Sequence, residues 1–257
     1  MQVGGREACG GMIDTHCHID LYDNPLQIAT AAEKRKVRTI AVTYLPSHYE
    51  LACEHLKGFQ YLLPSLGLHP HAVHDHQKEI PLFLKHVESA EYVGEVGLDF
   101  SGLNKESQLA QEKSFDIVVS HIKEASKCVT VHSRGAEDAV LRALQNGGTG
   151  PVIFHWFSGS KSQLGRVLDA GHFISINTAM ISTSKWNDLI EYVPQSSVLT
   201  ETDGPFVKLK GLPAVPSDVQ YVVEWLAEKW KIGGREAGQR VMENFDRLPA
   251  NMCKNAK

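Results

Sequence analysis

Short apolar segments alternate with helical segments along almost the whole chain of 257 residues. Apolar, β-branched runs predict strands from residue 12 onward and over residues 37–43, 61–68, 92–98, 129–132, 152–155, 173–176 and 198–202. Helical patterns predict helices near residues 26–36, 46–56, 81–89, 106–126, 136–145, 161–169, 186–192, 219–231 and 235–245. This alternation is typical of parallel strands joined by crossover helices, and therefore of an α/β fold.

The number of units and the absence of a linker favour a single closed (β/α)8 TIM barrel. The alternative, an open doubly wound sheet, gathers its ligands at one crevice. Here candidate ligands follow the first, fourth, fifth, sixth and eighth strands, and only a closed ring brings those ends together. We expect one barrel domain over residues 12–257 and a flexible, glycine-rich tail over residues 1–11.

The composition is that of an ordinary globular protein, with 42% hydrophobic and 22% charged residues. A net charge of -4 argues against a broadly basic surface that coats nucleic acid, so a phosphate-bearing ligand would need a metal ion or local cations. The five scattered cysteines fit reduced thiols. Because there is no apolar run of membrane-spanning length and no apolar signal core, we expect a cytoplasmic protein without membrane contact.

A His-x-His pair, His16 and His18, lies on the first predicted strand. Residues two apart on a strand point to one side, so both imidazoles can face one metal ion. By itself the pair is a weak pattern that also arises by chance in an apolar strand. Four further ligand-type residues follow short apolar runs in the same way: Glu95, His132, His155 and Asp203. Because barrel active sites form where strands end, these side chains predict one metal centre.

Six donors exceed what one catalytic ion takes from a protein, which is about three. We therefore expect two divalent ions, and nitrogen and oxygen donors without thiolate fit magnesium, manganese or zinc. Glu95 is the expected bridge, because a carboxylate offers two oxygens. His16, His18 and Asp203, from the first and last strands, would complete the coordination of one ion. His132 and His155, from the middle strands, would complete that of the other. Such a pair of ions can activate water and clamp the oxygens of a phosphoryl displacement.

Asp203 can act twice, binding the first ion with one oxygen and accepting a proton from the attacking water with the other. The alternative is a turn aspartate, since Asp-Gly-Pro is a common turn sequence. Its occurrence together with the other ligand-type residues favours the catalytic interpretation. Asp203 is then the general base and Glu95 the bridging catalytic carboxylate.

Four residues near the expected mouth are candidates for binding a substrate phosphate: His69, Arg134, Ser158 and Lys161. His69 can donate to phosphate or simply precede proline in a turn, and Arg134 can pair with phosphate or remain an exposed loop residue. Residues 158–161 predict a small-residue turn into a helix N-terminus, which can hold phosphate or serve only as a helix cap.

Other polar and aromatic residues have supporting roles or none in this interpretation. Asp14 and Asp99 are expected to orient the ligands. The histidine-rich residues 71–76 lie in a polar loop, and we expect no functional metal there. Trp156 and Phe157 can stack on a base, although packing at the barrel rim is the commoner role of such residues.

Six motifs occur in order along the chain: DTHCHID at 14–20, GLHP at 67–70, GEVGLD at 94–99, VHSR at 131–134, HWFSGS at 155–160 and ETD at 201–203. In order and spacing they resemble the motifs of the TatD family of metal-dependent deoxyribonucleases, from residue 12 to about residue 248. The resemblance implies an amidohydrolase-type barrel and divalent-metal-dependent DNA hydrolysis, often from the 3′ end of single strands. It also implies the same six metal ligands.

The chain departs from that family pattern in two short segments. Residues 204–213 lack the Arg-Asn-Pro-like element of many relatives, and residues 100–102 replace the usual aromatic and polar residues. With residues 20–22 and 155–159, these departures most resemble the QatD nucleases of a bacterial anti-phage defence cluster. That narrower resemblance implies protein partners from the same cluster.

Two other functions stay open beside the leading hypothesis of a two-metal phosphodiesterase acting on DNA. A metal-activated water also attacks carbonyl carbon, as in an amide or ester hydrolase that deacylates aminoacylated nucleic acid. The chain can also be a non-catalytic subunit of a defence complex.

Overall fold

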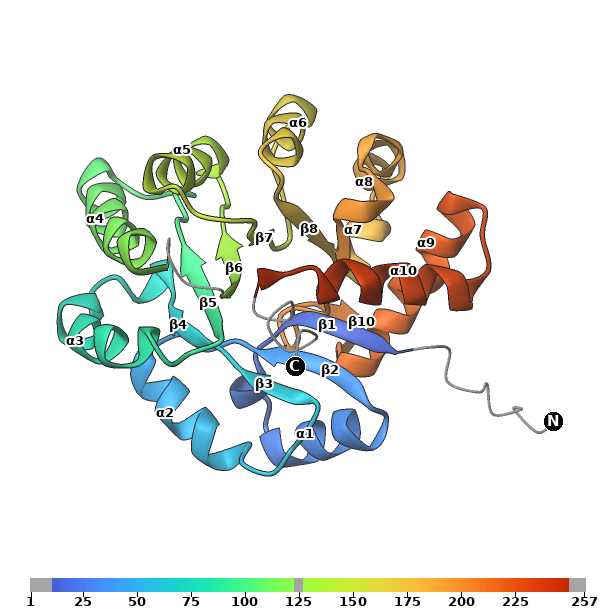
Figure 1. Ribbon diagram of the computed structural model, residues 1–257, viewed down its shortest axis with the longest axis horizontal. Coiled ribbons are helices and arrows are strands. Elements are labelled where there is room, and N and C mark those ends of the chain that lie inside the picture. Colours follow the sequence, from blue (N-terminus) through green and yellow to red (C-terminus); the bar gives the residue numbers. More distant parts are fainter. Residues whose placement is uncertain (1–10, 123–126, 250–257) are drawn as a thin grey trace.

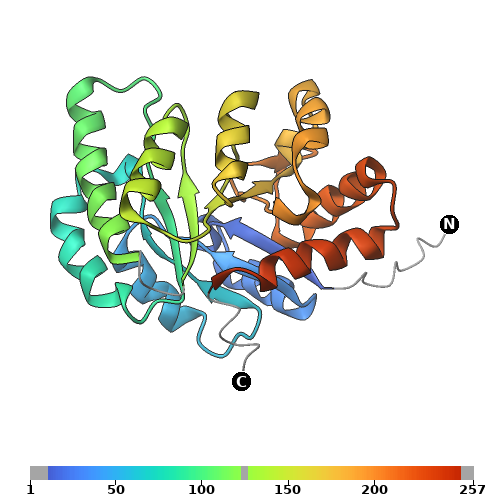
Figure 2. The same ribbon diagram turned by 45° about the horizontal axis from the view of Figure 1, so that its top comes forward.

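Parallel strands occupy the centre of the protein, and helices cover them from outside (Figures 1 and 2). The computed structural model describes residues 11–122 and 127–249. The strands of the central ring are β1 (Met12–Cys17), β2 (Val37–Ala41), β3 (Leu62–Pro64), β4 (Leu66–Leu68), β5 (Tyr92–Gly97), β6 (Cys128–His132), β7 (Ile153–Phe154), β8 (Phe173–Ile176) and β9 (Val198–Thr200). β10 (Lys208–Leu209) and β11 (Leu212–Pro213) form a separate antiparallel hairpin.

The strands follow one another around a ring. β1, β2 and β3 pair in order, and so do β4 through β9, always in parallel. The third predicted strand is divided at Ser65, so that β3 pairs with β2 and β4 pairs with β5. Two threonines join β9 to β1: Thr200 Oγ1 donates to the Ile13 carbonyl at 2.5 Å, and Thr15 Oγ1 donates to the Thr200 carbonyl at 3.1 Å. If β3 and β4 count as one strand position, the ring has the eight positions of the predicted TIM barrel.

The outer layer contains α1 (Pro25–Lys34), α2 (Pro46–His55), α3 (His76–Val87), α4 (Lys105–Ile122), α5 (Glu137–Gly147), α6 (Lys161–Asp169), α7 (Thr178–Ile181), α8 (Ser184–Leu189), α9 (Val219–Trp230) and α10 (Gly234–Asp246). Short 3-10 helices lie in the connections: η1 (Ile19–Leu21), η2 (Pro70–Ala72), η3 (Ile190–Tyr192), η4 (Gln195–Ser197) and η5 (Pro216–Asp218). Proline occupies the first position of α1 and α2, where its missing N–H has no partner to lose.

Two predicted helices differ from the observed ones, and the short helix α7 was not predicted. The helix expected from Pro81 begins at His76, because Pro81 lies inside α3 and is not the N-terminal signal that its residue type suggests. The helix expected over residues 186–192 ends as α8 at Leu189 and continues as the 3-10 turn η3. Residues 123–126 of the helix predicted over 106–126 lie outside the described residues.

The core is formed by apolar side chains from both strands and helices. Val131, Ile153 and Ile174 of the ring are fully buried, as are Phe83 of α3 and Leu144 of α5. Strands covered on both faces are apolar throughout, which explains why they appear in the sequence as short continuous apolar runs. Each such side chain contributes about 1.5–3 kcal/mol by its removal from water. Over residues 11–122 and 127–249, no helix has both the length and the apolar character needed to cross a bilayer.

The predicted tail over residues 1–11 lies, except for Gly11, outside the described residues, so the domain boundary at residue 12 stays a prediction. Of the five cysteines, the described ones are Cys17, Cys53 and Cys128, and all three are free thiols.

Gly67 of β4 and Gly165 of α6 provide a matched test of barrel packing. A Cβ on Gly67 would lie 1.6 Å from the Thr43 carbonyl oxygen, whereas a Cβ on Gly165 would meet nothing within 4 Å. We expect Gly67→Ala to lower the free energy of unfolding by about 3 kcal/mol or more. Gly165→Ala should raise it by about 0.5–1 kcal/mol, because alanine favours the helix. Urea unfolding measures both, and a Gly67→Ala protein as stable as wild type would contradict this packing.

Candidate metal centre

The six predicted ligands meet at one end of the barrel, where the strands reach their C-terminal ends. They line or lie beneath a cavity of about 550 Å³ whose wall also includes Tyr44, Arg134 and Phe206. The contributing elements are far apart in sequence, from β1 to the residues after β9. The closed ring therefore brings together side chains that an open sheet would hold apart.

One oxygen of Glu95 faces the two histidines of the first strand. Glu95 Oε2 lies 3.2 Å from His16 Nε2 and 3.2 Å from His18 Nε2. Asp203 Oδ1 lies 3.8 Å from the first of these nitrogens and 3.7 Å from the second. The side chains predicted for the first ion are thus gathered around one point.

The other oxygen of Glu95 faces a different pair of histidines. Glu95 Oε1 lies 2.6 Å from His132 Nδ1 and 3.0 Å from His155 Nε2, and these two nitrogens are 3.3 Å apart. Glu95 is 2% exposed, so neither oxygen is freely hydrated. The two halves of its carboxylate therefore serve two separate donor groups, which is the arrangement expected of a bridge.

The charges in this centre fit a bound cation. Burial opposes ionisation of Glu95, but the charges of His69, His155 and His16 and a hydrogen bond from His132 outweigh it and hold the pKa of Glu95 well below its usual value. Burial alone would lower the pKa of His155, but Glu95 and Glu201 raise it well above the ordinary value. Without a metal, the buried carboxylates thus require protonated imidazole as their counter-charge. A divalent ion can replace those protons and can accept the nitrogen lone pairs that face one another.

Asp99 orients His132, as its place beyond the fourth predicted strand suggests. Asp99 Oδ2 lies 2.9 Å from His132 Nε2 and 2.8 Å from His71 Nε2. Burial opposes ionisation of Asp99, but these hydrogen bonds lower its pKa far below the usual value. A carboxylate on the outer nitrogen fixes the ring and directs Nδ1 of His132 towards Glu95.

Glu201 supports His155 on the opposite side, and sequence reasoning assigned it no role. Its side chain accepts hydrogen bonds from Trp156 N at 3.0 Å and Asn177 Nδ2 at 2.9 Å and from the Ser175 hydroxyl, and lies 3.7 Å from His155 Nδ1. It is fully buried. The sequence offered one signal for this role: Glu201 is a glutamate at the end of an apolar strand, two residues before Asp203.

Asp14 and Thr130 hold the first strand's ligands in different ways. Asp14 accepts hydrogen bonds from Thr202 N at 2.9 Å and from His16 N at 3.2 Å. The predicted orienting role of Asp14 thus acts on the backbone where β1 approaches the segment after β9, and not on an imidazole. The ring of His16 is held by Thr130, whose Oγ1 lies 3.0 Å from His16 Nδ1.

His69 lies inside the centre and not at its rim. It is 3% exposed, and its Nε2 lies 3.1 Å from Glu95 Oε2. Its Nδ1 accepts a hydrogen bond from the His71 backbone N–H at 3.0 Å. In a neutral imidazole the proton must then be on Nε2, and burial lowers the pKa of His69 to about 4. His69 therefore presents a hydrogen-bond donor to the centre, not a metal-binding lone pair.

The remaining substrate candidates fall into two groups. Arg134 and Ser158 line the cavity, although the Ser158 hydroxyl already donates to Glu137 Oε1 at 3.0 Å. Lys161 lies elsewhere: its Nζ is 3.0 Å from the ring centre of Tyr192, and it does not line the cavity. The turn before α6 serves as a helix cap, which was the alternative prediction, because Ser160 and Gln163 form a capping box there.

The histidine-rich loop does not form one cluster. His71 binds Asp99, whereas His76 Nε2 lies 2.9 Å from the His69 carbonyl. The aromatic pair is likewise divided, since Phe157 is 1% exposed and belongs to the core, while Trp156 is 38% exposed and lines the cavity.

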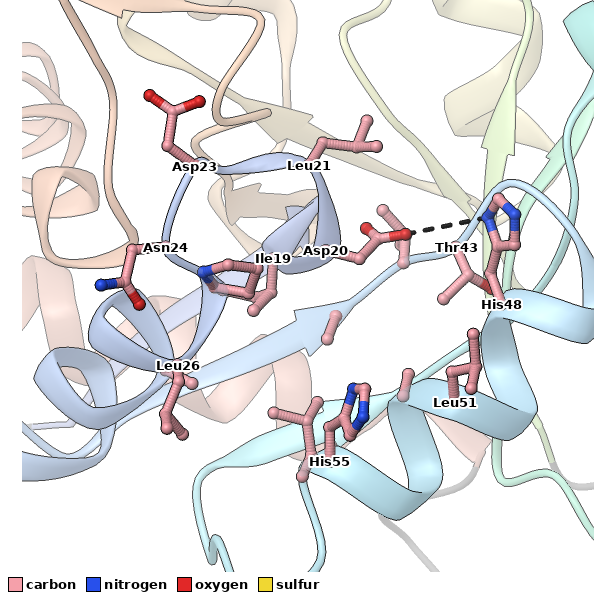
Figure 3. A pocket seen from close by; sticks show the side chains of 16 residues that line it. Ile19, Asp20, Leu21, Asp23, Asn24, Leu26, Thr43, His48, Leu51 and His55 are labelled. Carbon is pink, nitrogen blue, oxygen red and sulfur yellow. Dashed lines mark ion pairs between the residues drawn. The ribbon is translucent and has the colours of Figure 1, made fainter.

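A larger cavity, of about 710 Å³, lies apart from this centre between α1 and α2 (Figure 3). Leu26 and Leu51 flank it, and Asp20 and His48, 3.8 Å apart, lie at one end. No group of metal-binding side chains found within residues 11–122 and 127–249 includes any of these four residues. The candidate metal-binding groups therefore lie at the smaller cavity.

Asp203 gives the metal-free protein a measurable pH dependence. Burial raises the pKa of Asp203 to about 7, although His155 and His18 oppose the shift. An unfolded aspartate has a pKa of about 3.9, so between about pH 4 and pH 7 only the folded state holds this proton. Its contribution to stability is full below about pH 4 and is lost as the pH rises through about 7.

We expect Asp203→Asn, which stays neutral, to exceed metal-free wild type in free energy of unfolding by up to about 4 kcal/mol at pH 8, with little difference at pH 4. Urea unfolding in the presence of chelator measures this. Added manganese should reverse the order at pH 8, because only wild type gains full metal affinity. An equal difference at both pH values would be inconsistent with a buried, protonated Asp203.

A family model of TatD-related DNases matches residues 13–249. Over 263 aligned residues, which cover 95% of this chain and 96% of the relative, the chain is 26% identical to the human deoxyribonuclease TATDN3. It is also 28% identical to an uncharacterized metal-dependent hydrolase of Methanocaldococcus jannaschii, with coverage of 94% and 95%.

Solved structures show the same architecture. The TatD homologue YjjV of Escherichia coli matches with a TM-score of 0.80 and 27% identity, over 92% of this chain and 97% of that one. The phosphotriesterase homology protein of Escherichia coli matches with a TM-score of 0.62 over 95% and 97%, and at 15% identity it shows the amidohydrolase-like fold alone. The family model spans nearly the whole barrel, including every residue of the metal centre. The chain therefore belongs to the family of TatD-related, metal-dependent deoxyribonucleases.

Proposed function

We propose that the protein is a two-metal phosphodiesterase that removes nucleotides from the 3′ end of single-stranded DNA. The observation that carries this proposal is the division of Glu95: Oε2 faces His16 and His18, and Oε1 faces His132 and His155. Two donor groups around one carboxylate support two ions and not one. The name of the human relative, a deoxyribonuclease, supports DNA as the substrate.

The ligand residues would be the six predicted ones, with His69 excluded by its proton on Nε2. Divalent magnesium, manganese or zinc bound there would supply an acidified water and positive charge for the phosphate oxygens. The chain's own contribution is to orient the donors and to accept a proton. Asp203 is the proposed base, because no hydrogen bond from another side chain to its carboxylate occurs among the described residues and it lines the cavity beside Glu95.

His69 is proposed to bind the substrate phosphate. Its Nε2–H points towards Glu95 Oε2, on the floor of the cavity where a phosphate oxygen must enter. A buried donor at this place would stabilise developing negative charge on that oxygen. Arg134 and Ser158, on the cavity wall, are proposed to contact the neighbouring phosphates.

A single-stranded end suits this cavity. At about 550 Å³ it has the size of a small-molecule site, enough for the end of a strand and far less than a duplex occupies. The chain is proposed to act in the cytoplasm. Its departures over residues 100–102 and 204–213 support a role in an anti-phage defence cluster with protein partners from that cluster.

Glu95→Gln tests the proposal. Losing one anionic oxygen from the bridge should lower bound metal and reduce hydrolysis of single-stranded DNA by about 10³-fold or more. Nuclease assays with magnesium, manganese and zinc, together with elemental analysis, measure both effects. An aminoacylated oligonucleotide assayed in parallel separates phosphodiester from ester hydrolysis. Wild-type nuclease activity in Glu95→Gln would refute the proposal.

His69→Gln separates a hydrogen-bond donor from a ligand. We expect kcat to fall by about 10²-fold, because one charge-stabilising donor is lost, while the metal content stays at the wild-type level. His132→Gln is the matched control and should lose both metal and activity. Should His69→Gln also lose metal, the tautomer assigned to His69 would be wrong.

A further inference from the structure

Two large aromatic side chains remain exposed at the metal centre. Trp156 is 38% exposed and Phe206 is 51% exposed, and both line the cavity. Their neighbours Phe154 and Phe157 are buried in the core. Aromatic surface left in water is ready to be covered by a flat ligand, and stacking on an aromatic ring adds attraction beyond simple burial.

Phe206 lies at one end of a chain of ring contacts that crosses the centre. The rings of His18 and His16 are 5.2 Å apart, and those of His16 and His155 stack at 3.8 Å. Phe206 packs edge-on against His18 at 5.1 Å. Trp156 directly follows His155 in the sequence. Phe206 therefore stands beside the first donor group, and Trp156, which lines the same cavity, is carried by the residue next to a donor of the second.

Hydrogen bonds hold the backbone of both aromatic residues before any ligand binds. Trp156 has a φ of 35°, which is disfavoured for a residue with a side chain, and its N–H is held by Glu201 Oε1 at 3.0 Å. The Phe206 N–H donates to the Asp203 carbonyl at 3.0 Å. Glu201 and Asp203, which belong to the centre, thus also hold the backbone that carries the aromatic rings.

We propose that Trp156 and Phe206 are two base-stacking platforms, one on each side of the scissile phosphodiester, which make the centre select unpaired nucleotides. This inference rests on the proposed nuclease function and extends it to specificity. Every base presents a π-face, so such platforms bind without reading sequence. A base inside a duplex is already stacked on both faces and must be freed first, at a cost that an unpaired end does not have.

Hydrolysis of a short single-stranded oligonucleotide tests the platforms. Trp156→Ala and Phe206→Ala should each lower kcat/KM by about tenfold or more, mainly through KM, whereas Trp156→Phe and Phe206→Tyr should keep most of the activity. An abasic unit on one side of the scissile linkage should cancel the effect of one alanine substitution, and an abasic unit on the other side should cancel the other. Tyr221→Ala is the control, because its ring is 42% exposed but lies outside the cavity wall.

Two results would overturn the inference. The first concerns a substrate that is abasic on both sides of the scissile linkage. If each alanine variant loses as much activity on this substrate as on the unmodified one, compared with wild type, the side chains act on the fold or the centre and not on bases. If neither abasic position changes the size of either effect, the two rings do not stack on the adjoining nucleotides.

Binding of an oligonucleotide that carries 2-aminopurine, measured by its fluorescence in the presence of chelator, separates this inference from the nuclease proposal. Stacking on either ring should quench the probe, and each alanine variant should lose part of the quenching. If quenching depends on both residues but wild type hydrolyses DNA with none of the ions, the nuclease proposal alone is refuted. If wild type hydrolyses DNA and the alanine variants still quench the probe fully, only the proposal of stacking platforms is refuted.

Discussion

Glu95 is 2% exposed and surrounded by imidazoles, and the compensation of this buried negative charge is the constraint on which the rest of the centre depends. An isolated carboxylate in such a place would cost several kcal/mol or would take up a proton. Asp203 shows the second outcome, since burial raises its pKa to about 7. Glu95 stays ionised because imidazoles surround it and because His132 and His155, whose pKa values are raised, lie next to Oε1. Protonated histidine supplies the compensating positive charge without a metal, and a cation supplies it permanently.

The barrel places the imidazoles that surround Glu95. Candidate donors on β1, β5 and β6 and directly after β1, β7 and β9 are fixed by strands whose other side chains are packed in the core. The two middle histidines present different nitrogens to Glu95, Nδ1 from His132 and Nε2 from His155. Asp99 and Glu201 lie on the opposite sides of these rings and stabilise the two orientations. The strands thus fix the positions of the His132 and His155 rings, and the carboxylates of Asp99 and Glu201 determine which nitrogen of each ring faces the centre.

Periodicity and motif position were sufficient to predict the barrel and the group of side chains that gather in it. Short apolar runs determine where strands end, and in a closed parallel barrel every strand end lies on the same face. The direction in which a loop side chain points is not contained in that pattern. His69 was expected at the mouth but lies beneath it, because the His71 N–H holds its Nδ1. Lys161 was expected to face phosphate but lies over Tyr192, a contact between residues of different helices that no local signal marks. Glu201 was missed because its partners come from β8 and the segment after β7.

Two non-glycine residues at this face have left-handed backbones, Trp156 with φ 35° and Asp203 with φ 50°. Conformations of this kind cost about 1–3 kcal/mol each and persist only where other contacts hold them. Here those contacts are the Trp156 N–H to Glu201 and the Asp203 N–H to the His16 carbonyl, at 3.0 and 2.8 Å. Each strained residue lies shortly after a strand of the ring, Trp156 after β7 and next to His155, and Asp203 after β9 and three residues before Phe206. The strained positions are therefore in the same short segments that carry candidate metal donors and the exposed aromatic rings.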